Sequence, residues 1–408
     1  GNITYAATYT YNGQTYTIPT SGGALNINPT TGLITGKIPA SYEGDFSVTI
    51  IANSSTGASA SKTIDYNLMS QADFNAIEVI GPRYGAYLLA QDIGDNLMVG
   101  VGDDDILRYD FLKTGKGVIA DLNEATVDKQ NGYVDSVDGY KEIVGTQYDD
   151  IIIAKDGVQT NVNAYKGNDL IYSSSGGDII VGGDGFDTVS YERSTGAVNV
   201  DLLNQNTNWG FAQNDTLVGI EALEGSKYND VLKGDNANNT LTGGAGSDKL
   251  YGNGGNDTFI IDENDSIVDG GSGYDRVMIT DDNSYNGNHI SFAGAYTVGA
   301  SVDVSGIEEI NMDNKSYNET LHITVKDLIG SSEDNIVRIK GDLVSDFDGA
   351  YTDDNVQIHD KTAAEINNAD RGTTTYQGVR YDVYDFGSEG KLYVEYGLDV
   401  LDASGNQV

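Results

Sequence analysis

The chain has no cysteine, only 4 prolines, 1 tryptophan and 3 histidines, and few basic residues. Without cysteine, neither disulfide bonds nor thiol chemistry can stabilise the protein or drive a reaction. Only 23 lysine and arginine residues face 62 aspartate and glutamate residues, so the formal charge is -39. Nucleic acid and anionic membrane surfaces are therefore poor partners, and cations are the natural ones. No run of about eighteen apolar residues is present, so no membrane insertion is expected.

Glycine and aspartate, by contrast, recur at a fixed spacing. A nine-residue frame runs unbroken from residue 225 to 278 in six rows, two of which match the pattern G-G-x-G-x-D-x-U-x at every defined place, with U an apolar residue. Glycines at the first, second and fourth places are expected to form a turn with positive φ. A three-residue strand follows each turn and carries one inward apolar residue: Leu232, Leu241, Leu250, Phe259, Val268 and Val277.

The spacing also predicts stacked carboxylates. If two rows complete one coil, residues eighteen apart lie above one another, as Asp230 above Asp248 and Asp257 above Asp275. Stacked carboxylates repel unless a cation lies between them, and a hard divalent cation accepts oxygens from carboxylates and turn carbonyls. Calcium, as multiple ions, is therefore the expected cofactor. Asn239 and Ser266 occupy the aspartate place, which should weaken the sites that they share with Asp257 and Asp248.

Fainter rows of the same frame begin at residue 91. They cover residues 91–108, 145–153 and 164–190. A longer repeat of about eighty residues overlies them, because DILRY, GVIADL and EIVGTQYDD recur as DTVSY, AVNVDL and ALEGSKYND. We therefore expect a coiled region over residues 91–278, with excursions at 109–144 and 191–224 that each contain a strand, at the GVIADL or AVNVDL segment, and form loops packing against the coils.

The flanks are also rich in β-forming residues. Residues 1–68 alternate in period two between turn signals, as in a β-sandwich, and the stretch LNINPTTGLITGKIPASYEGDFSVTIIAN resembles immunoglobulin-like modules of bacterial surface proteins. Residues 69–90 are interpreted as a connector. Residues 279–408 leave the nine-residue frame, and their strand candidates predict a β-rich cap that covers the open end of the coil. A ligand module is the alternative, suggested by Tyr376, Tyr381, Tyr384, Phe386, Tyr393 and Tyr396.

Together these features resemble the C-terminal region of a large RTX (nonapeptide-repeat, type I-secreted) bacterial adhesin. The resemblance implies an all-β chain, with an immunoglobulin-like β-sandwich, an interrupted parallel β-roll and a β-rich cap. Carried over by motif place, it makes these residues the metal ligands: Asp103, Asp105, Asp150, Asp169, Asp178, Asp187, Asp230, Asp248, Asp257 and Asp275 through carboxylates, and Gly182, Gly183, Gly243, Gly244, Gly246, Gly252, Gly270, Gly271 and Gly273 through carbonyls. Rows 91–99, 154–163 and 261–269 lack the turn glycines, which puts full occupancy there in doubt.

No catalytic motif is present. His289, His322 and His359 lie outside any H-E-x-x-H pattern, G-x-S-x-G is absent, and carboxylates this abundant give no glycosidase signal. We therefore expect no catalytic residues and no enzyme. The expected function is calcium-dependent adhesion, as in biofilms, by a secreted protein at the bacterial cell surface. The competing hypotheses are a glycan- or peptide-binding module of the adhesin tip, a self-assembling surface-layer protein, and an accessory domain of a secreted enzyme.

Overall fold

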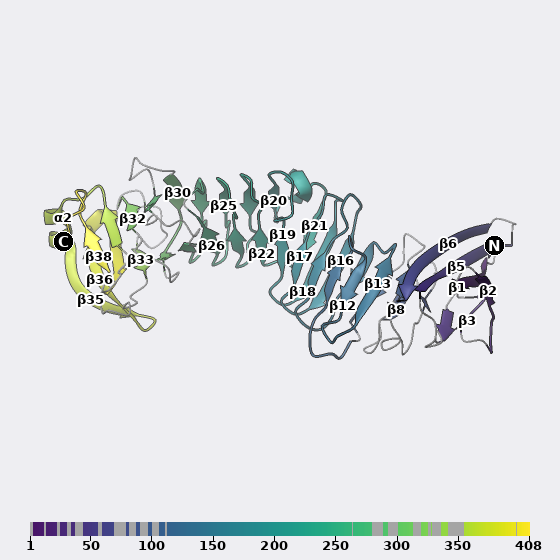
Figure 1. Cartoon of the computed structure of the whole chain (residues 1–408). Helices are drawn as coiled ribbons and strands as arrows, with labels where there is room; N and C mark the ends of the chain where they lie inside the picture. Colours follow the sequence, from purple (N-terminus) through teal and green to yellow (C-terminus); the bar gives the residue numbers. More distant parts are fainter. Residues whose placement is uncertain are drawn as a thin grey trace. The chain divides into compact units, whose positions relative to one another are not determined.

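The computed structural model describes residues 3–11, 14–22, 25–30, 34–36, 44–55, 59–68, 79–80, 87–89, 97–99, 106–110, 112–262, 264–279, 289–292, 301–312, 320–324, 328, 336–341, 355–396 and 398–408. Nearly all of the regular structure is β-strand (Figure 1), which confirms the all-β expectation. The chain divides into two compact units, residues 1–188 with 215–220 and residues 189–214 with 221–408. Among the described residues, no helix has the length and apolar character needed to span a membrane.

The N-terminal part of the first unit is an antiparallel sheet. Its strand order is β2-β1-β5-β6. The strands are β1 (Ile3–Tyr11), β2 (Gln14–Ile18), β5 (Gly44–Ser54) and β6 (Ser59–Leu68), while β3 (Leu25–Ile27) and β4 (Ile34–Gly36) pair separately. Ile18, Leu25, Ile34 and Val48 are buried, as the period-two alternation predicts. The immunoglobulin-like topology stays a prediction, and the connector at 69–90 lies largely outside the described residues.

The rest of the first unit is a parallel β-roll. One ladder contains β8 (Tyr87–Leu89), β10 (Ile106–Arg108), β14 (Glu142–Val144), β16 (Asn161–Lys166), β18 (Ile179–Asp184) and β21 (Thr216–Val218). In it, Ile143 pairs with Val162 and Val162 with Ile180, so that one buried apolar residue per coil stacks on the next. In the second ladder, β15 (Ile151–Ile153) pairs with β17 (Leu170–Tyr172), and β7 (Val79–Ile80) pairs with β9 (Leu97–Val99). The strand β19 (Thr188–Ser190) follows β17 along the chain.

The first excursion is part of this roll, contrary to the expectation of a loop packed against it. Its strand β11 (Ile119–Asp121) pairs in parallel with β15, and β13 (Val134–Asp138) pairs in parallel with β9; β12 (Thr126–Asp128) lies antiparallel to both excursion strands. The reason is that inward Ala120 and Val137 continue the apolar stack. Buried Asp135 binds Lys129 Nζ at 2.7 Å and accepts the Tyr109 hydroxyl at 3.0 Å, which holds the meander in place.

The second unit contains the regular rows as two facing parallel ladders of short strands (Figure 1). One ladder runs through β22 (Ala222–Glu224), β24 (Thr240–Thr242), β26 (Thr258–Ile261) and β28 (Arg276–Ile279), and the other through β20 (Asn199–Asp201), β23 (Val231–Lys233), β25 (Lys249–Tyr251) and β27 (Ile267–Asp269). Leu232 pairs with Leu250, Leu250 with Val268, and Leu241 with Phe259, which confirms the eighteen-residue coil. All six predicted inward residues are fully buried.

The parallel ladders continue past residue 278, although the nine-residue frame ends there. Coils of other lengths add β30 (Ser301–Ser305), β31 (Glu309–Asn311), β33 (Ile336–Lys340) and β37 (Lys391–Glu395), and a parallel series links β29 (His289–Phe292), β32 (Thr320–Ile323), β34 (Asn355–Ile358) and β38 (Asp399–Leu401). The strand-rich character expected for residues 279–408 is thereby confirmed within the part of this region that the structure describes. The cap itself stays a prediction.

The last part of the second unit departs from the coil. Strands β35 (Asp370–Tyr376) and β36 (Val379–Asp385) form an antiparallel hairpin, and β36 pairs antiparallel with β37. The helix α2 (Ala363–Ala369) begins with a capping box between Thr362 and Glu365. Short 3-10 turns lie at η1 (Gln205–Thr207), η2 (Gly210–Ala212) and η3 (Gly387–Glu389).

Candidate metal sites in the turns of the roll

The predicted aspartates lie directly before strands, with side chains buried in the turns. Asp150, Asp169, Asp178, Asp187, Asp230, Asp248, Asp257 and Asp275 each expose 2% of their surface or less. The main-chain N–H of one aspartate donates to Oδ1 of the next along the stack: Asp230 to Asp248 at 2.7 Å, Asp257 to Asp275 at 2.8 Å, and Asp169 to Asp187 at 3.0 Å. The predicted stacking of Asp230 with Asp248 and of Asp257 with Asp275 is therefore confirmed, and Asp169 and Asp187 stack in the same way. Asp103 and Asp105 lie outside the described residues.

The second carboxylate oxygen separates the aspartates into two groups. In Asp169, Asp248 and Asp257, the Oδ2 atom is buried and accepts no hydrogen bond. A buried carboxylate oxygen without a donor is costly, because it has lost water and gained no partner. These three oxygens fit a bound cation, which needs no donor hydrogen.

Carbonyl oxygens converge on the same points. A Cβ atom added to Gly252 would lie 2.1 Å from Asp257 Oδ2 and 2.4 Å from the Gly270 carbonyl oxygen. The equivalent atom on Gly270 would lie 2.0 Å from the carbonyl oxygen of Gly306 and 2.5 Å from Asp275 Oδ2. A carboxylate oxygen and a carbonyl oxygen therefore approach the main chain closely at the first glycine of these rows, and both are donors of the kind that calcium prefers.

This geometry corrects one expectation about the glycines. The first-place glycines Gly182, Gly243, Gly252 and Gly270 do not adopt positive φ; they are needed because a side chain would clash with the oxygens packed against them. Positive φ occurs at the second and fourth places, for example 91° at Gly244 and 138° at Gly246. Second-place Gly183 and Gly271 and fourth-place Gly273 share that conformation.

Burial shifts the pKa of these carboxyls. It raises the pKa of Asp169 to about 8, with help from the charges of Asp150 and Asp187. It raises the pKa of Asp248 to about 8, with the charge of Asp265 as the next contribution in that direction, and the pKa of Asp257 to about 6. Without a cation, burial therefore disfavours the ionised form of each of these groups. A divalent cation favours the ionised form, so metal binding releases protons.

A second group of aspartates finds donors within its own turn. Asp150, Asp178 and Asp230 accept hydrogen bonds at both carboxylate oxygens, including one or more from the hydroxyl residue four positions earlier: Thr146, Ser174 and Ser226. The sequence pattern alone does not separate these from Asp169, Asp248 and Asp257.

Asp265 is a functional candidate that the nine-residue frame missed. Ser266 stands at the aspartate place, but the carboxylate of Asp265 accepts the N–H of Asp248 at 3.2 Å and the N–H of Asp262 at 3.1 Å. The stack at Asp248 therefore keeps a carboxylate neighbour, which the expectation of a weakened site did not include. The adjacent acidic residue was the available signal.

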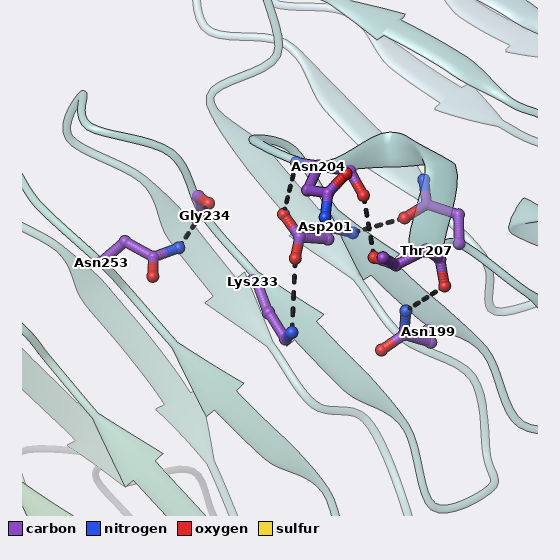
Figure 2. A network of polar contacts seen from close by, with 8 residues as sticks. Asn199, Asp201, Asn204, Thr207, Lys233, Gly234 and Asn253 are labelled. Carbon is purple, nitrogen blue, oxygen red and sulfur yellow. Dashed lines mark hydrogen bonds and ion pairs between the residues drawn. The ribbon is translucent and has the colours of Figure 1, made fainter.

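Amides at the fifth place of the row form a further ladder. Asn238 Oδ1 accepts the N–H of Asn256 at 2.7 Å, and Asn256 Oδ1 accepts the N–H of Tyr274 at 2.9 Å. At the second place, Asn253 adopts φ 72° and its side-chain amide donates to the Gly234 carbonyl at 2.8 Å (Figure 2). Successive turns are therefore joined by side chains as well as by strands.

The second excursion uses an acidic residue to hold its own loop. Asp201 at the end of β20 accepts the N–H of Asn204 at 2.7 Å, and its other oxygen lies 3.3 Å from Lys233 Nζ (Figure 2). Asn199 donates to the Thr207 carbonyl at 2.8 Å. Asp121 does the same for its loop in the first excursion, where it accepts the N–H groups of Asn123 and Glu124.

The C-terminal aromatic residues do not form one exposed platform. Tyr381 is fully buried, and the guanidinium of Arg338 lies 4.3 Å from the Tyr376 ring centre and 5.5 Å from that of Tyr393. Tyr396 is 48% exposed and lies against Arg380, 3.7 Å from the ring centre. Two of the six rings therefore pack around the buried Arg338 and a third, Tyr381, is buried, as expected for sheet packing rather than for a sugar-binding face.

The donor set excludes a site made of side chains alone. In the described part of the chain, no three His, Cys, Asp or Glu side chains cluster around a common point. Each candidate site therefore depends on main-chain carbonyls, which suit calcium and not zinc.

Comparison with known proteins agrees with this chemistry. The family model described as RTX calcium-binding nonapeptide repeat (4 copies) matches residues 161–189 and 224–259. The matched segments contain Asp169, Asp178, Asp187, Asp230, Asp248 and Asp257. The cofactor is thus calcium, and the repeated copies bind several ions. A search of curated proteins found no match to the chain.

Proposed function

We propose that the chain is a non-enzymatic, calcium-dependent segment of a secreted bacterial surface adhesin, whose roll folds when calcium binds after export. The observation that carries the proposal is the buried Oδ2 oxygen of Asp169, Asp248 and Asp257, which accepts no hydrogen bond. The matched repeats are a non-catalytic, calcium-binding motif of the kind typical of secreted proteins.

The proposed mechanism couples folding to metal binding. At low calcium in the cytosol, the buried carboxylates must be either protonated or unpaired, and each choice costs free energy. This keeps the roll unfolded enough for export. At millimolar calcium outside the cell, binding to the folded state alone supplies the missing free energy.

The test is to remove calcium from the purified chain. Circular dichroism in EDTA should lose most of its β signal, and added calcium should restore it. The melting temperature should rise with free calcium concentration, because the metal binds the folded form and not the unfolded one. An unchanged melting temperature in EDTA would refute the proposal. Magnesium at the same concentration is the control for ionic strength.

A second candidate is a ligand-binding module at the adhesin tip. Trp209 in the second excursion favours it, because this side chain is 46% exposed while its main chain is held by two hydrogen bonds to Asn199. An exposed aromatic ring on a main chain held in place is a common contact in binding interfaces. A glycan and peptide array probed in millimolar calcium, with an EDTA control and Trp209→Ala, tests it. A calcium-dependent hit that Trp209→Ala abolishes would assign this role.

A surface-layer role and an enzyme-accessory role predict different behaviour from the same preparation. A surface-layer protein should grow in light scattering as calcium is added, whereas an adhesin segment should stay monomeric. An accessory role in a secreted enzyme requires a catalytic domain elsewhere in the same polypeptide.

A further inference from the structure

Two turns of the roll, one in each unit, contain equivalent hydrogen-bond networks. In the first unit, Asp150 Oδ1 accepts the N–H of Val118 at 2.6 Å, and its Oδ2 accepts the N–H of Thr146 at 2.6 Å. In the second unit, Asp230 Oδ1 accepts the N–H of Val198 at 2.7 Å, and its Oδ2 accepts the N–H of Ser226. Each residue of the second network lies 80 positions after its counterpart.

A hydroxyl group completes each network. The Thr146 hydroxyl donates to Asp150 Oδ1 at 2.9 Å, and the Ser226 hydroxyl lies 2.9 Å from Asp230 Oδ2. Both hydroxyl oxygens also accept the N–H two residues later, at Tyr148 and Tyr228. Thr146 is fully buried and Ser226 is 2% exposed, so no water is needed to satisfy these groups.

The main chain of these turns also differs from that of the glycine turns. In the turns that end at Asp169, Asp248 and Asp257, the second place has positive φ: 80° at Tyr165, 91° at Gly244 and 72° at Asn253. Thr146 and Ser226 do not adopt positive φ. The network therefore accompanies a different turn shape, in addition to different side chains.

The third hydroxyl turn, at residues 173–178, follows the same rule. The N–H and hydroxyl groups of Ser174 both donate to Asp178 Oδ2 at 2.9 Å, and the N–H of Thr160 donates to Oδ1 at 2.8 Å. As in the other two turns, the carboxylate accepts donors at both oxygens. Asp169, Asp248 and Asp257 each have an Oδ2 atom that accepts none.

We propose that the turns at Thr146–Asp150 and Ser226–Asp230 close without calcium and act as starter turns, from which the calcium-dependent coils that follow are built. Each network joins an excursion strand, β11 or β20, to the first regular coil of its block. A coil held by its own donors is available before any metal binds. The inference rests on the calcium chemistry of the glycine turns, and it removes Asp150, Asp178 and Asp230 from the expected ligands.

Counting bound calcium in the full chain tests this assignment. Asp→Asn is the suitable substitution because Asn239 already occupies the same place, where its side-chain oxygen accepts the N–H of Asp235 at 2.8 Å. Asp230→Asn should leave the number of tightly bound calcium ions unchanged, whereas Asp257→Asn should lower it by at least one per molecule. The number is measured by elemental analysis after desalting, on protein shown to be folded by circular dichroism. A loss in Asp230→Asn equal to that in Asp257→Asn would overturn the proposal.

If Asp230→Asn does not fold, a second variant and a second measurement still test the proposal. Ser226→Ala removes the hydroxyl and should lower the melting temperature at an unchanged calcium number; a lower number would contradict the assignment. In EDTA, amide hydrogen exchange should be slower at Val198 and Ser226 than at Asp248 and Asp257. Equally fast exchange at all four amides refutes the starter turns, whereas equally slow exchange at all four refutes calcium-dependent folding instead.

Discussion

The oxygens packed against Gly252 give a sharp prediction for one added methyl group. In Gly252→Ala, the new Cβ atom would lie 2.1 Å from Asp257 Oδ2 and 2.4 Å from the Gly270 carbonyl oxygen, both far inside contact distance. The carboxylate and the neighbouring turn must therefore move apart. Overpacking of this kind costs about 1–3 kcal/mol. The smaller entropy of the unfolded alanine chain offsets only about 0.4–1 kcal/mol of that cost.

The same methyl group should also remove a calcium ion, because it displaces two oxygens, of Asp257 and Gly270, that are proposed as calcium donors. At a free calcium concentration of about 100 times the dissociation constant, one lost site removes a further ~2.7 kcal/mol of stability. Isothermal titration with calcium should report at least one ion fewer per molecule, and thermal unfolding at fixed millimolar calcium should report a lower melting temperature.

Gly196→Ala is the matched control in the same unit. An added Cβ there meets no atom within 4 Å, and Gly196 does not have positive φ. Its calcium number should be unchanged, and its stability should stay within about 0.5 kcal/mol of the parent. If Gly252→Ala binds as much calcium and melts at the same temperature as Gly196→Ala, the oxygens around Gly252 are not calcium ligands.

Three further outcomes are expected. Asp248→Ala should lower calcium affinity more than Ser266→Ala, because the carboxylate stacks with Asp230 whereas the serine hydroxyl only donates to the Asp248 carbonyl; equal titration curves would contradict the stacking. The double variant Ser226→Gly with Tyr228→Gly restores the full glycine pattern and should bind one more calcium ion, so an unchanged elemental count would argue against the role given to the hydroxyl. Burial lowers the pKa of His359, against the opposing charge of Asp360, so the unfolded state binds more protons below pH ~6.5. The free energy of unfolding should therefore fall as the pH drops. His359→Gln should make this pH dependence weaker in thermal melts at saturating calcium.

The sequence predicted the regular part of the roll well because one simple rule governs it. An apolar residue at every ninth position must face inward, and Leu232, Leu250 and Val268 accordingly stack in one ladder. The position of each aspartate before a strand followed from the same rule. The coils beyond residue 278 could not be predicted, because their lengths vary and the ladder pairing between β28 and β31 leaves no fixed period to detect.

The finer features of the site depend on contacts that a pattern does not contain. The frame could not show that Asp265 replaces Ser266, or that Thr146 and Ser226 donate to the carboxylates that were assigned to metal. It also predicted the wrong reason for glycine at the first place of the row, since a side chain there lacks room and the backbone conformation is not the constraint. The helix α2, by contrast, has a readable signal in the sequence, because Thr362 and Glu365 form the capping box at its start.

The strands of the second-unit roll run across the direction in which its coils stack, so the ladder hydrogen bonds point along that direction. Tension applied along the stack would load these bonds a few at a time, and the coils would peel away singly instead of shearing together. Each eighteen-residue coil that opens releases up to about 60 Å of chain. Calcium bridges between successive turns would then set the force at which each coil yields. A roll of this kind would lengthen stepwise under load and rewind when the load falls, for as long as calcium is present.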